Sequence, residues 1–496
     1  MILASPVAAQ SPDPAPQPTS LWRSGWAWAA CGVGIALIGL HLLHGLITND
    51  TLWHEATGQW ILTHRAVPHR DPFSWSVRGT PWVAQEWLWE VGLTLVWHVG
   101  GLWGVMLYTW APAWFLWPVV AATYHRAGGR SPWVLLPLAA GTDIALMQFW
   151  PARPETLTYL WFALLLYILT RIRQGERRWA WALVPLTWIW ANMHASFVLA
   201  IVFIGIELAR AFTPIRWGRL VNAPLPRATR RTLGLAFLAS LVAGSLTPQG
   251  PSLYSYAWRM STTNVMRQFI VEWQSPNFHL PIYLIVFAMA AALLVWTWAT
   301  TDDLPLWWVI YAGGFTYGFL DSQRFLGYLC VAIPLMVAVL PMSWAPSIRF
   351  PRSHGILLSL VLLALVVSQW PANSIAASIR QGGAPVGAVN YYIRHAHGAH
   401  IFNEYSLGDY LIYRHVAPYI DGRADVYTQT PVWSAYLAIT GLERNPEPYF
   451  RAHHITWVLL KPHRPLDVWL ATQPTWHLAY RSSHGWLWQA VGGASS

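Results

Sequence analysis

Carboxylates and imidazoles gather in residues 49–75, directly after the first long apolar run of the chain. The groups in this stretch are Asp50, His54, Glu55, His64, His69 and Asp71. Such groups cost free energy to desolvate, so a cluster beside an apolar run is either a hydrated surface loop or a functional site. Asp50 and Asp71 are the candidate catalytic residues, because a carboxylate here can act as a general base or ligate a divalent cation such as Mg²⁺ or Mn²⁺.

Both acids also have a structural alternative. Asp50 can be a hydrated residue at a helix end, and Asp71 precedes a proline and can form a turn. The spacing of the histidines matches no known metal signature. We therefore expect His54 and its neighbour Glu55 to contact substrate through hydrogen bonds, and we expect any metal ion to be held by Asp50 and Asp71.

Two arginines are expected near the outer edge of the membrane: Arg153 in WPARPETLTY and Arg324 in LDSQRFL. A guanidinium is a planar fork that matches the oxygens of a phosphate or a carboxylate. A phosphate-bearing lipid head at this depth would explain both residues. The alternative is that each arginine forms an ordinary ion pair, Arg153 with Glu155 and Arg324 with Asp321.

Two further residues complete the predicted substrate-binding set. His194, in WANMHAS, lies near the outer end of an apolar run, where an interhelical hydrogen bond is the alternative role. Glu272 lies in a long loop, TPQGPSLYSYAWRMSTTNVMRQFIVEWQSP, whose length suits a segment that covers substrate.

The composition indicates a membrane protein. Of 496 residues, 55% are hydrophobic and only 10% are charged. Soluble domains carry about 25% charged residues, so this chain cannot cover its surface with water-facing groups. The 36 tryptophans suit the headgroup region of a bilayer. The formal net charge of +10 resides mainly in short Arg-rich links between apolar runs, which argues against a nucleic-acid-binding face.

We predict a polytopic α-helical membrane protein with about eleven spanning helices. Residues 1–25 form a disordered cytoplasmic tail, residues 26–372 the transmembrane domain, and residues 48–101 an external loop with interfacial helices, one of them over 84–98. Short Arg-rich links stay in the cytoplasm, which places the N-terminus inside and the acid-bearing loops outside. The predicted spans are 26–47, 102–124, 131–150, 156–172, 179–197, 198–212, 232–246, 282–299, 306–321, 325–341 and 355–370.

Residues 381–491 read as a small extracytoplasmic α/β domain, because charges and prolines increase and the apolar runs shorten to strand length. The expected strands are HIFNEY, PYIDGR, ITWVLLK, WHLAYRSS and GWLWQAV. The expected helices are PVGAVNYYIRH, SLGDYLIYRH and PVWSAYLAITGL.

Several segments in order resemble the GT-C superfamily of membrane glycosyltransferases, and more narrowly the bacterial proteins related to protein mannosyltransferases. The segments are NDTLWHEATGQWILTHRAVPHRDPFSW, PWVAQEWLWE, RPETLTYLW, WIWANMHASFVL, LTPQGPSLY, VEWQSP, SQRF, IFNEYSLGDYLIY and YIDGRADVY. The resemblance implies a polyprenyl-phosphate or polyprenyl-diphosphate sugar donor, and it places Asp50 at the position of the catalytic acid. Characterised protein O-mannosyltransferases carry Asp-Glu at this point, whereas this chain has Asn49-Asp50-Thr51.

These observations predict a glycosyltransferase in a bacterial inner membrane. It would move a sugar from a polyprenyl-phosphate-linked donor to a glycan, lipid or protein acceptor on the outer side. The alternative is a non-enzymatic polytopic protein, either a lipid-carrier transporter or an assembly partner. A transporter would need charged groups through the middle of the bilayer, and the chain has few.

Overall fold

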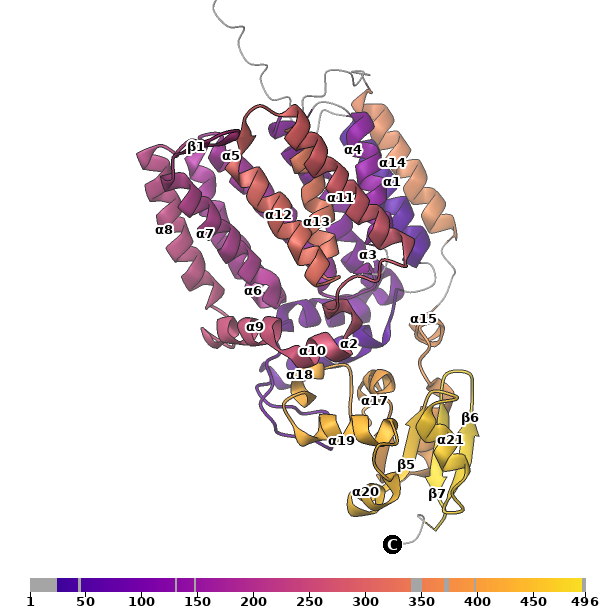
Figure 1. Cartoon of the computed structure of the whole chain (residues 1–496). Helices are drawn as coiled ribbons and strands as arrows, with labels where there is room; N and C mark the ends of the chain where they lie inside the picture. Colours follow the sequence, from indigo (N-terminus) through magenta and orange to yellow (C-terminus); the bar gives the residue numbers. More distant parts are fainter. Residues whose placement is uncertain are drawn as a thin grey trace, which may run out of the picture.

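The computed structural model describes residues 25–42, 46–129, 132–146, 149–339, 350–369, 374–396 and 398–492. The predicted N-terminal tail lies outside these residues, apart from Gly25. A bundle of long helices stands above a smaller α/β part, and short helices lie between the two (Figure 1).

In the described part of the chain, five helical stretches are both long and apolar enough to cross a membrane. They are α3 (Trp87–Arg126), α5 (Glu155–Arg173), η4 with α7 (Ala195–Phe212), α11 (Pro281–Thr300) and α14 (Arg352–Gln369). Five is fewer than the predicted eleven, because most other helices of the bundle are shorter than 18 residues and α8 carries three arginines. These others are α1 (Gly25–Leu42), α4 (Pro132–Ala145), η3 (Arg177–Ala182), α6 (Leu183–Met193), α8 (Arg227–Gly244), α12 (Leu306–Asp321) and α13 (Phe325–Val337).

The predicted interfacial helix and the predicted span that follows it form one element, α3, with a sharp break. Gly101 has φ 53° and ψ −140°, a left-handed conformation that favours glycine. The break separates residues 87–100 from the apolar stretch that follows. Helix α2 (Asn49–His64) packs against α3, and Gly58 permits the close approach because a Cβ at this position would strike the backbone of Glu90.

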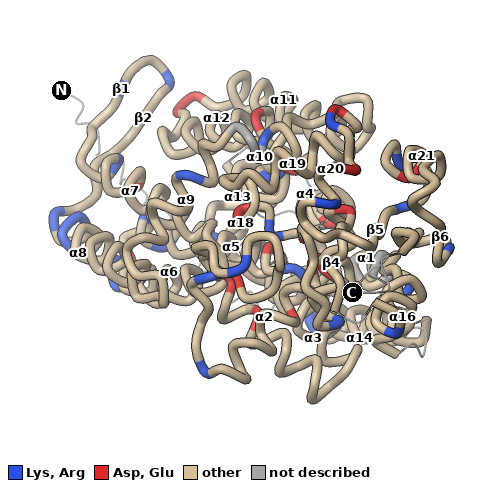
Figure 2. Tube along the Cα trace, turned by 90° about the horizontal axis from the view of Figure 1, so that it is seen from below, with Lys and Arg blue, Asp and Glu red and all other residues tan. Residues whose placement is uncertain are grey.

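Arginines gather at the end of the bundle far from the α/β part. Helix α5 begins at Glu155 beside the α/β part and ends at Arg173, whose Nη2 lies 2.8 Å from the buried Glu207 carboxylate. A small sheet follows α7, with β1 (Ile215–Trp217) and β2 (Leu220–Asn222) antiparallel and β3 (Leu304–Pro305) parallel to β2. The edge that carries α8 and the β1–β2 hairpin shows arginine residues (Figure 2).

The α/β part contains a four-stranded sheet in the order β4-β5-β7-β6. Its strands are β4 (His400–Asn403), β5 (Ile455–Leu460), β6 (Trp476–Arg481) and β7 (Trp486–Ala490); β4 and β5 are parallel and the other pairs antiparallel. Helices surround it: α15 (Ile375–Gln381), α16 (Val386–His395), η6 (Tyr405–Leu407), α17 (Gly408–Tyr413), α18 (Ala424–Tyr427), α19 (Pro431–Thr440), α20 (Pro446–Ala452) and α21 (Pro465–Ala471). Four predicted strands and the three predicted helices are present.

The strand predicted at PYIDGR is wrong. Residues 418–423 run as irregular chain, and their polar groups bind side chains rather than a neighbouring strand. The backbone N–H of Tyr419 donates to Asn403 Oδ1 at 2.8 Å, and the N–H of Arg423 donates to Asp421 Oδ1 at 3.0 Å. The apolar residues of this segment are buried all the same, which is why the sequence read as a strand.

The loop after α2 is joined to the α/β part by buried polar contacts. Arg423 Nη1 lies 2.7 Å from Asp71 Oδ1, and its Nη2 lies 2.7 Å from Asp421 Oδ2, with all three side chains 0% exposed. Nearby, Trp75 donates its backbone N–H to Pro418 O and its indole N–H to Ile401 O. The loop and the α/β part therefore form one packed unit.

We predict that Arg423→Met destabilises the protein by about 3–5 kcal/mol, because two buried carboxylates lose their counter-charge. The measurement is thermal or denaturant unfolding of the detergent-solubilised protein, followed by tryptophan fluorescence. The control is Arg451→Met, whose side chain is 73% exposed in a pair with Glu447 and should change stability by less than about 1 kcal/mol. Equal effects of the two variants would contradict the assignment.

Candidate functional site

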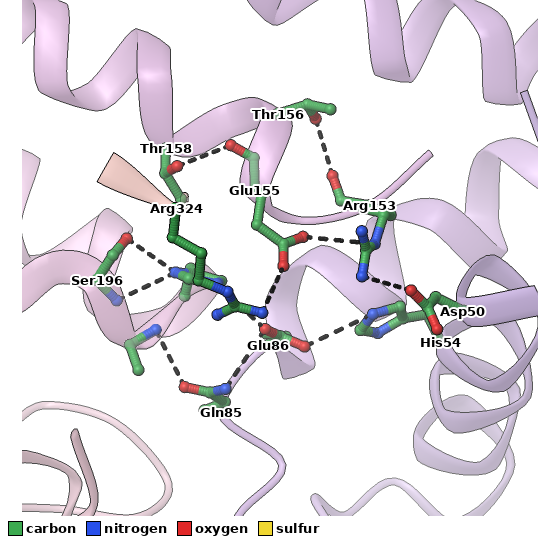
Figure 3. A network of polar contacts seen from close by, with 12 residues as sticks. Asp50, His54, Gln85, Glu86, Arg153, Glu155, Thr156, Thr158, Ser196 and Arg324 are labelled. Atoms are coloured by element: carbon green, nitrogen blue, oxygen red, sulfur yellow. Dashed lines mark hydrogen bonds and ion pairs between the residues drawn. The ribbon is translucent and has the colours of Figure 1, made fainter. Parts of the chain in front are cut away.

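A cavity of about 460 Å³ lies where the helical bundle, the loop after α2 and the α/β part meet. Its walls come from segments far apart in the sequence. Four of them are the starts of α2, α3 and α5 and the turn between α6 and α7. The others are the loop carrying α9 (Ser252–Thr262), α10 (Asn264–Phe269) and η5 (Val271–Trp273), the turn before α13, and residues 422–425. Side chains from these segments point toward one another across the cavity (Figure 3).

Two guanidinium groups and three carboxylates share one wall. Arg153 Nη2 lies 2.5 Å from Asp50 Oδ2, and Arg153 Nη1 lies 2.8 Å from Glu272 Oε1. Arg324 Nη2 lies 3.2 Å from Glu272 Oε2 and 3.8 Å from Glu155 Oε1. Glu155 also lies 4.0 Å from Arg153 Nε. Each arginine thus contacts two or more carboxylates, and the charges largely balance.

Backbone contacts hold these five residues in place. Thr51 at the start of α2 donates its hydroxyl to Ala152 O at 2.9 Å, which ties Asp50 to the segment bearing Arg153. The backbone N–H of Arg324 donates to Glu272 O at 3.2 Å. The Arg324 guanidinium also lies 4.7 Å from the centre of the Trp273 ring, a cation–π contact.

Next to this group the cavity is lined by two imidazoles and two more acids. His54, one helical turn after Asp50, makes a 3.0 Å hydrogen bond from Nδ1 to Glu90 Oε1, and its Nε2 lies 3.7 Å from Glu86 Oε2. His194 Nδ1 accepts from the backbone N–H of Ser196 at 3.1 Å, so its Nε2 carries the proton that faces Glu86 Oε1 at 3.5 Å.

Burial sets the protonation of several of these groups. It lowers the pKa of His54 to about 3 and that of His194 to about 4, so both imidazoles are neutral at physiological pH. Burial raises the pKa of Glu86 well above its ordinary value, and the nearby charges of Glu155 and Glu90 add to the shift. Burial also raises the pKa of Asp50; Arg153 opposes that shift and Glu272 adds to it.

The α/β part closes one side of the cavity with residues 422–425. Asp425 Oδ2 accepts a hydrogen bond of 3.0 Å from the hydroxyl of Tyr256 on α9. This bond links the α/β part to the loop that carries Glu272. The cavity therefore depends on both parts of the chain.

The structure brings together most of the residues predicted from the sequence. Those that line the cavity are Asp50, His54, Arg153, His194, Glu272 and Arg324. Glu55 is buried on another face of α2, 3.6 Å from His98 Nε2, and it does not line the cavity. Asp71 also lies outside the lining, and its carboxylate is occupied by Arg423, the Ser74 side chain and two backbone N–H groups.

Asp50 and Asp71 accordingly share no contact through which they would hold one metal ion together. The simple ion pairs also differ from expectation: Arg153 bonds Asp50 and Glu272 more closely than Glu155, and Asp321 pairs with Arg267 at 2.9 Å.

Glu86, Glu90, Glu155 and Asp425 line the cavity but were not predicted as site residues. The spacing of Glu86 and Glu90 at i, i+4 in an otherwise apolar segment was the available signal. Glu155 was visible only as a neighbour of Arg153. Asp425 lies in YIDGRADVY, one of the segments that carry the resemblance, but only the tertiary packing brings it to Tyr256.

No family model and no curated protein matches the sequence. Solved structures of the archaeal oligosaccharyltransferase AglB from Archaeoglobus fulgidus share the fold. One, in complex with an inhibitory peptide and a dolichol-phosphate, is 11% identical, with a TM-score of 0.57 over 88% of this chain and 69% of that chain. The apo form is 9% identical, with a TM-score of 0.55 over 87% of this chain and 69% of that chain.

At these identities the likeness concerns the fold alone. The chain therefore has the fold of this archaeal oligosaccharyltransferase, and five of its described helical stretches are long and apolar enough to cross a membrane. The resemblance noted in the sequence is confirmed at this level.

We predict that Asp425→Asn removes a pH dependence of stability. Burial raises the pKa of Asp425 from 3.8 to about 6. Because the folded-state pKa is the higher one, wild type loses stability as the pH rises from about 4 through 6, whereas the Asn variant does not. Unfolding temperatures of both proteins at pH 4.5 and 7.0 measure this: the variant should gain relative to wild type at pH 7.0. Glu443→Gln, on an exposed turn, is the control. The prediction is contradicted if the difference in unfolding temperature between Asp425→Asn and wild type is the same at pH 4.5 and pH 7.0.

Proposed function

We propose that the protein is a GT-C glycosyltransferase of a bacterial inner membrane, with a cytoplasmic N-terminus. It moves a sugar from a polyprenyl-phosphate-linked donor to an acceptor at the extracytoplasmic face. The observation that carries the proposal is the convergence of Asp50, Arg153 and Arg324 on one cavity beside the apolar bundle. The sequence separates these residues by more than a hundred positions at each step.

The arginines suit the phosphate of the donor. Arg153 and Arg324 are held close together by Glu272, which contacts both. When a lipid phosphate enters, its oxygens can replace carboxylate oxygens around the two guanidinium groups with little change in geometry. The same groups then stabilise the negative charge that develops on the phosphate as the bond to the sugar breaks.

Asp50 suits the role of general base. Its side chain is 33% exposed to the cavity, and its present partner is Arg153. Once Arg153 turns to the donor phosphate, Asp50 is released to accept the proton of the acceptor hydroxyl or amide. The acceptor oxygen or nitrogen then bonds to the anomeric carbon as the phosphate leaves with the bonding electrons. The neutral imidazoles of His54 and His194 are placed to orient the acceptor.

The acceptor side is assigned to the α/β domain, which we place outside the membrane. Residues 422–425 form part of the cavity wall, opposite the bundle in which the lipid tail would lie. The Archaeoglobus fulgidus protein binds an inhibitory peptide together with a dolichol-phosphate. A peptide, glycan or lipid acceptor is compatible with the polar wall of this cavity. Asp71 contributes by fixing this domain rather than by touching the acceptor.

A divalent cation fits one side of this cavity better than the other. Asp50 and Glu272 already contact Arg153, so a cation beside them would lie against a guanidinium. His54, Glu86 and Glu90 contact no arginine in the described structure and offer ligand atoms within 4.8 Å of one another. If the reaction uses a cation, its charge would add to the polarisation of the acceptor.

We expect Asp50→Asn to lower sugar transfer at least about 100-fold, because the amide cannot accept a proton. The measurement uses membranes supplied with a radiolabelled polyprenyl-phosphate sugar and follows release of polyprenyl phosphate together with label in acceptor. Asp303→Asn, exposed at the far end of the bundle, should retain full activity. Normal transfer by a folded Asp50→Asn protein would remove Asp50 from the mechanism.

Arg324→Gln should lower transfer by about 100- to 1000-fold through lost stabilisation of the leaving phosphate. The same assay, run at several donor concentrations, separates weaker donor binding from a slower chemical step. Arg451→Gln, on the exposed surface of α20, serves as the matched control. If a folded Arg324→Gln protein transfers sugar like wild type, Arg324 does not stabilise the leaving phosphate.

A further inference from the structure

A group of arginines without counter-charges lies at the end of the bundle far from the cavity. They come from η3, from the β1–β2 hairpin and from the start of α8, and we call them the basic surface: Arg177, Arg178, Arg216, Arg219, Arg227, Arg230 and Arg231. Within the described ranges none of them forms an ion pair. The acids nearby do not balance them, because Glu176 and Glu207 already pair with other arginines.

The fold holds this surface in place. Helix α8 packs against both η3 and α7. Arg210 Nη1 donates to Asn222 Oδ1 at 2.7 Å, and Asn222 Nδ2 donates to Arg210 O at 2.8 Å, which fixes β2 to the end of α7. Arg210 is itself paired with the buried Glu207. The exposed arginines are therefore displayed by a packed platform.

The basic surface lies where two of the candidate spans end. Helix α7 ends next to β1, and α11 ends next to β3. Exposed aromatic rings lie at the same level: Phe212 is 55%, Trp217 81% and Trp298 67% exposed. The guanidinium of Arg230 lies 4.9 Å from the centre of the Phe212 ring, and that of Arg219 lies 5.6 Å from the Trp298 ring. Tryptophan and arginine together at the end of a span are typical of the headgroup level of a bilayer.

Helix stability does not explain the arginines of α8. The start of the helix carries Arg227, Arg230 and Arg231, and its first turn has no acidic residue. Cations at the N-terminal end of a helix oppose the helix dipole. Like charges spaced by three and four residues also repel each other. An anion that contacts these groups from outside the protein offsets both costs.

We propose that the basic surface binds anionic phospholipids of the leaflet in which it lies. A guanidinium matches the oxygens of a lipid phosphate, and clusters of arginine beside a span attract anionic headgroups. A lipid suits the surface better than a soluble anion, because the exposed rings of Phe212, Trp217 and Trp298 need apolar surroundings as well as polar ones. This surface is separate from the cavity, so the inference does not depend on sugar transfer.

The test measures lipid binding by the full chain without any sugar donor. The protein is purified in a neutral detergent, stripped of lipid and immobilised. It is then titrated in mixed micelles with radiolabelled phosphatidylglycerol or phosphatidylcholine, and the retained lipid is counted. We expect wild type to prefer phosphatidylglycerol. The α8 variant should bind phosphatidylglycerol at least about tenfold more weakly and phosphatidylcholine unchanged; it combines Arg227→Gln, Arg230→Gln and Arg231→Gln.

A second variant keeps the test decisive if the α8 variant does not fold. It combines Arg177→Gln with Arg178→Gln, at two exposed positions of η3, and should weaken phosphatidylglycerol binding about threefold. The matched control removes the same charge as the α8 variant from exposed positions near the α/β part, and it should bind like wild type: Arg78→Gln, Arg444→Gln and Arg451→Gln. Unfolding temperatures show which variants are folded.

Three outcomes overturn the proposal. In the first, wild type binds phosphatidylglycerol no better than phosphatidylcholine. In the second, the folded variants of the basic surface bind phosphatidylglycerol like wild type, or the control variant loses as much binding as they do. In the third, inorganic phosphate displaces the lipid more strongly than chloride at the same ionic strength, which would mean that the surface binds a free anion.

Discussion

The cavity depends on one constraint: charged side chains at the end of an apolar helical bundle must neutralise one another. Two guanidinium groups, Arg153 and Arg324, would be costly in such surroundings without counter-charges. Asp50, Glu155 and Glu272 supply them, each from a different segment. Under the proposed function, a donor phosphate could take the place of one of these carboxylates beside the two arginines without rebuilding the cavity.

The same principle joins the two parts of the chain. The buried Asp71–Arg423–Asp421 triad fixes the α/β domain against the loop after α2, and the Tyr256–Asp425 bond fixes it against the loop that carries Glu272. Both contacts fix the position of residues 422–425, which form part of the cavity wall. A domain that looks separate in the sequence is therefore part of the site.

The two walls of the cavity differ in chemistry. One presents guanidinium groups, suited to an anionic donor, and the other presents imidazoles and carboxylates, suited to a cation or to an acceptor's donor groups. Asp50 and His54 lie one turn apart on α2 and face these two sides. Under the proposed function, this short helix beneath the bundle would contact both partners of the transfer reaction (Figure 1).

The sequence by itself determined the membrane class, the helical bundle, the α/β domain with four of its strands, and six residues of the cavity. It could do so because hydropathy, periodicity and the occurrence of polar residues beside apolar runs are local properties. It misassigned residues 418–423, whose buried apolar side chains mimic a strand. It also grouped Asp71 with Asp50 because they are close in the chain. Only the tertiary structure decided that Asp71 pairs with Arg423 and that Arg153 pairs with Asp50 and Glu272. It also decided that Glu86, Glu90 and Asp425 reach the cavity. Ion pairing depends on distances across the fold, and no local pattern encodes them.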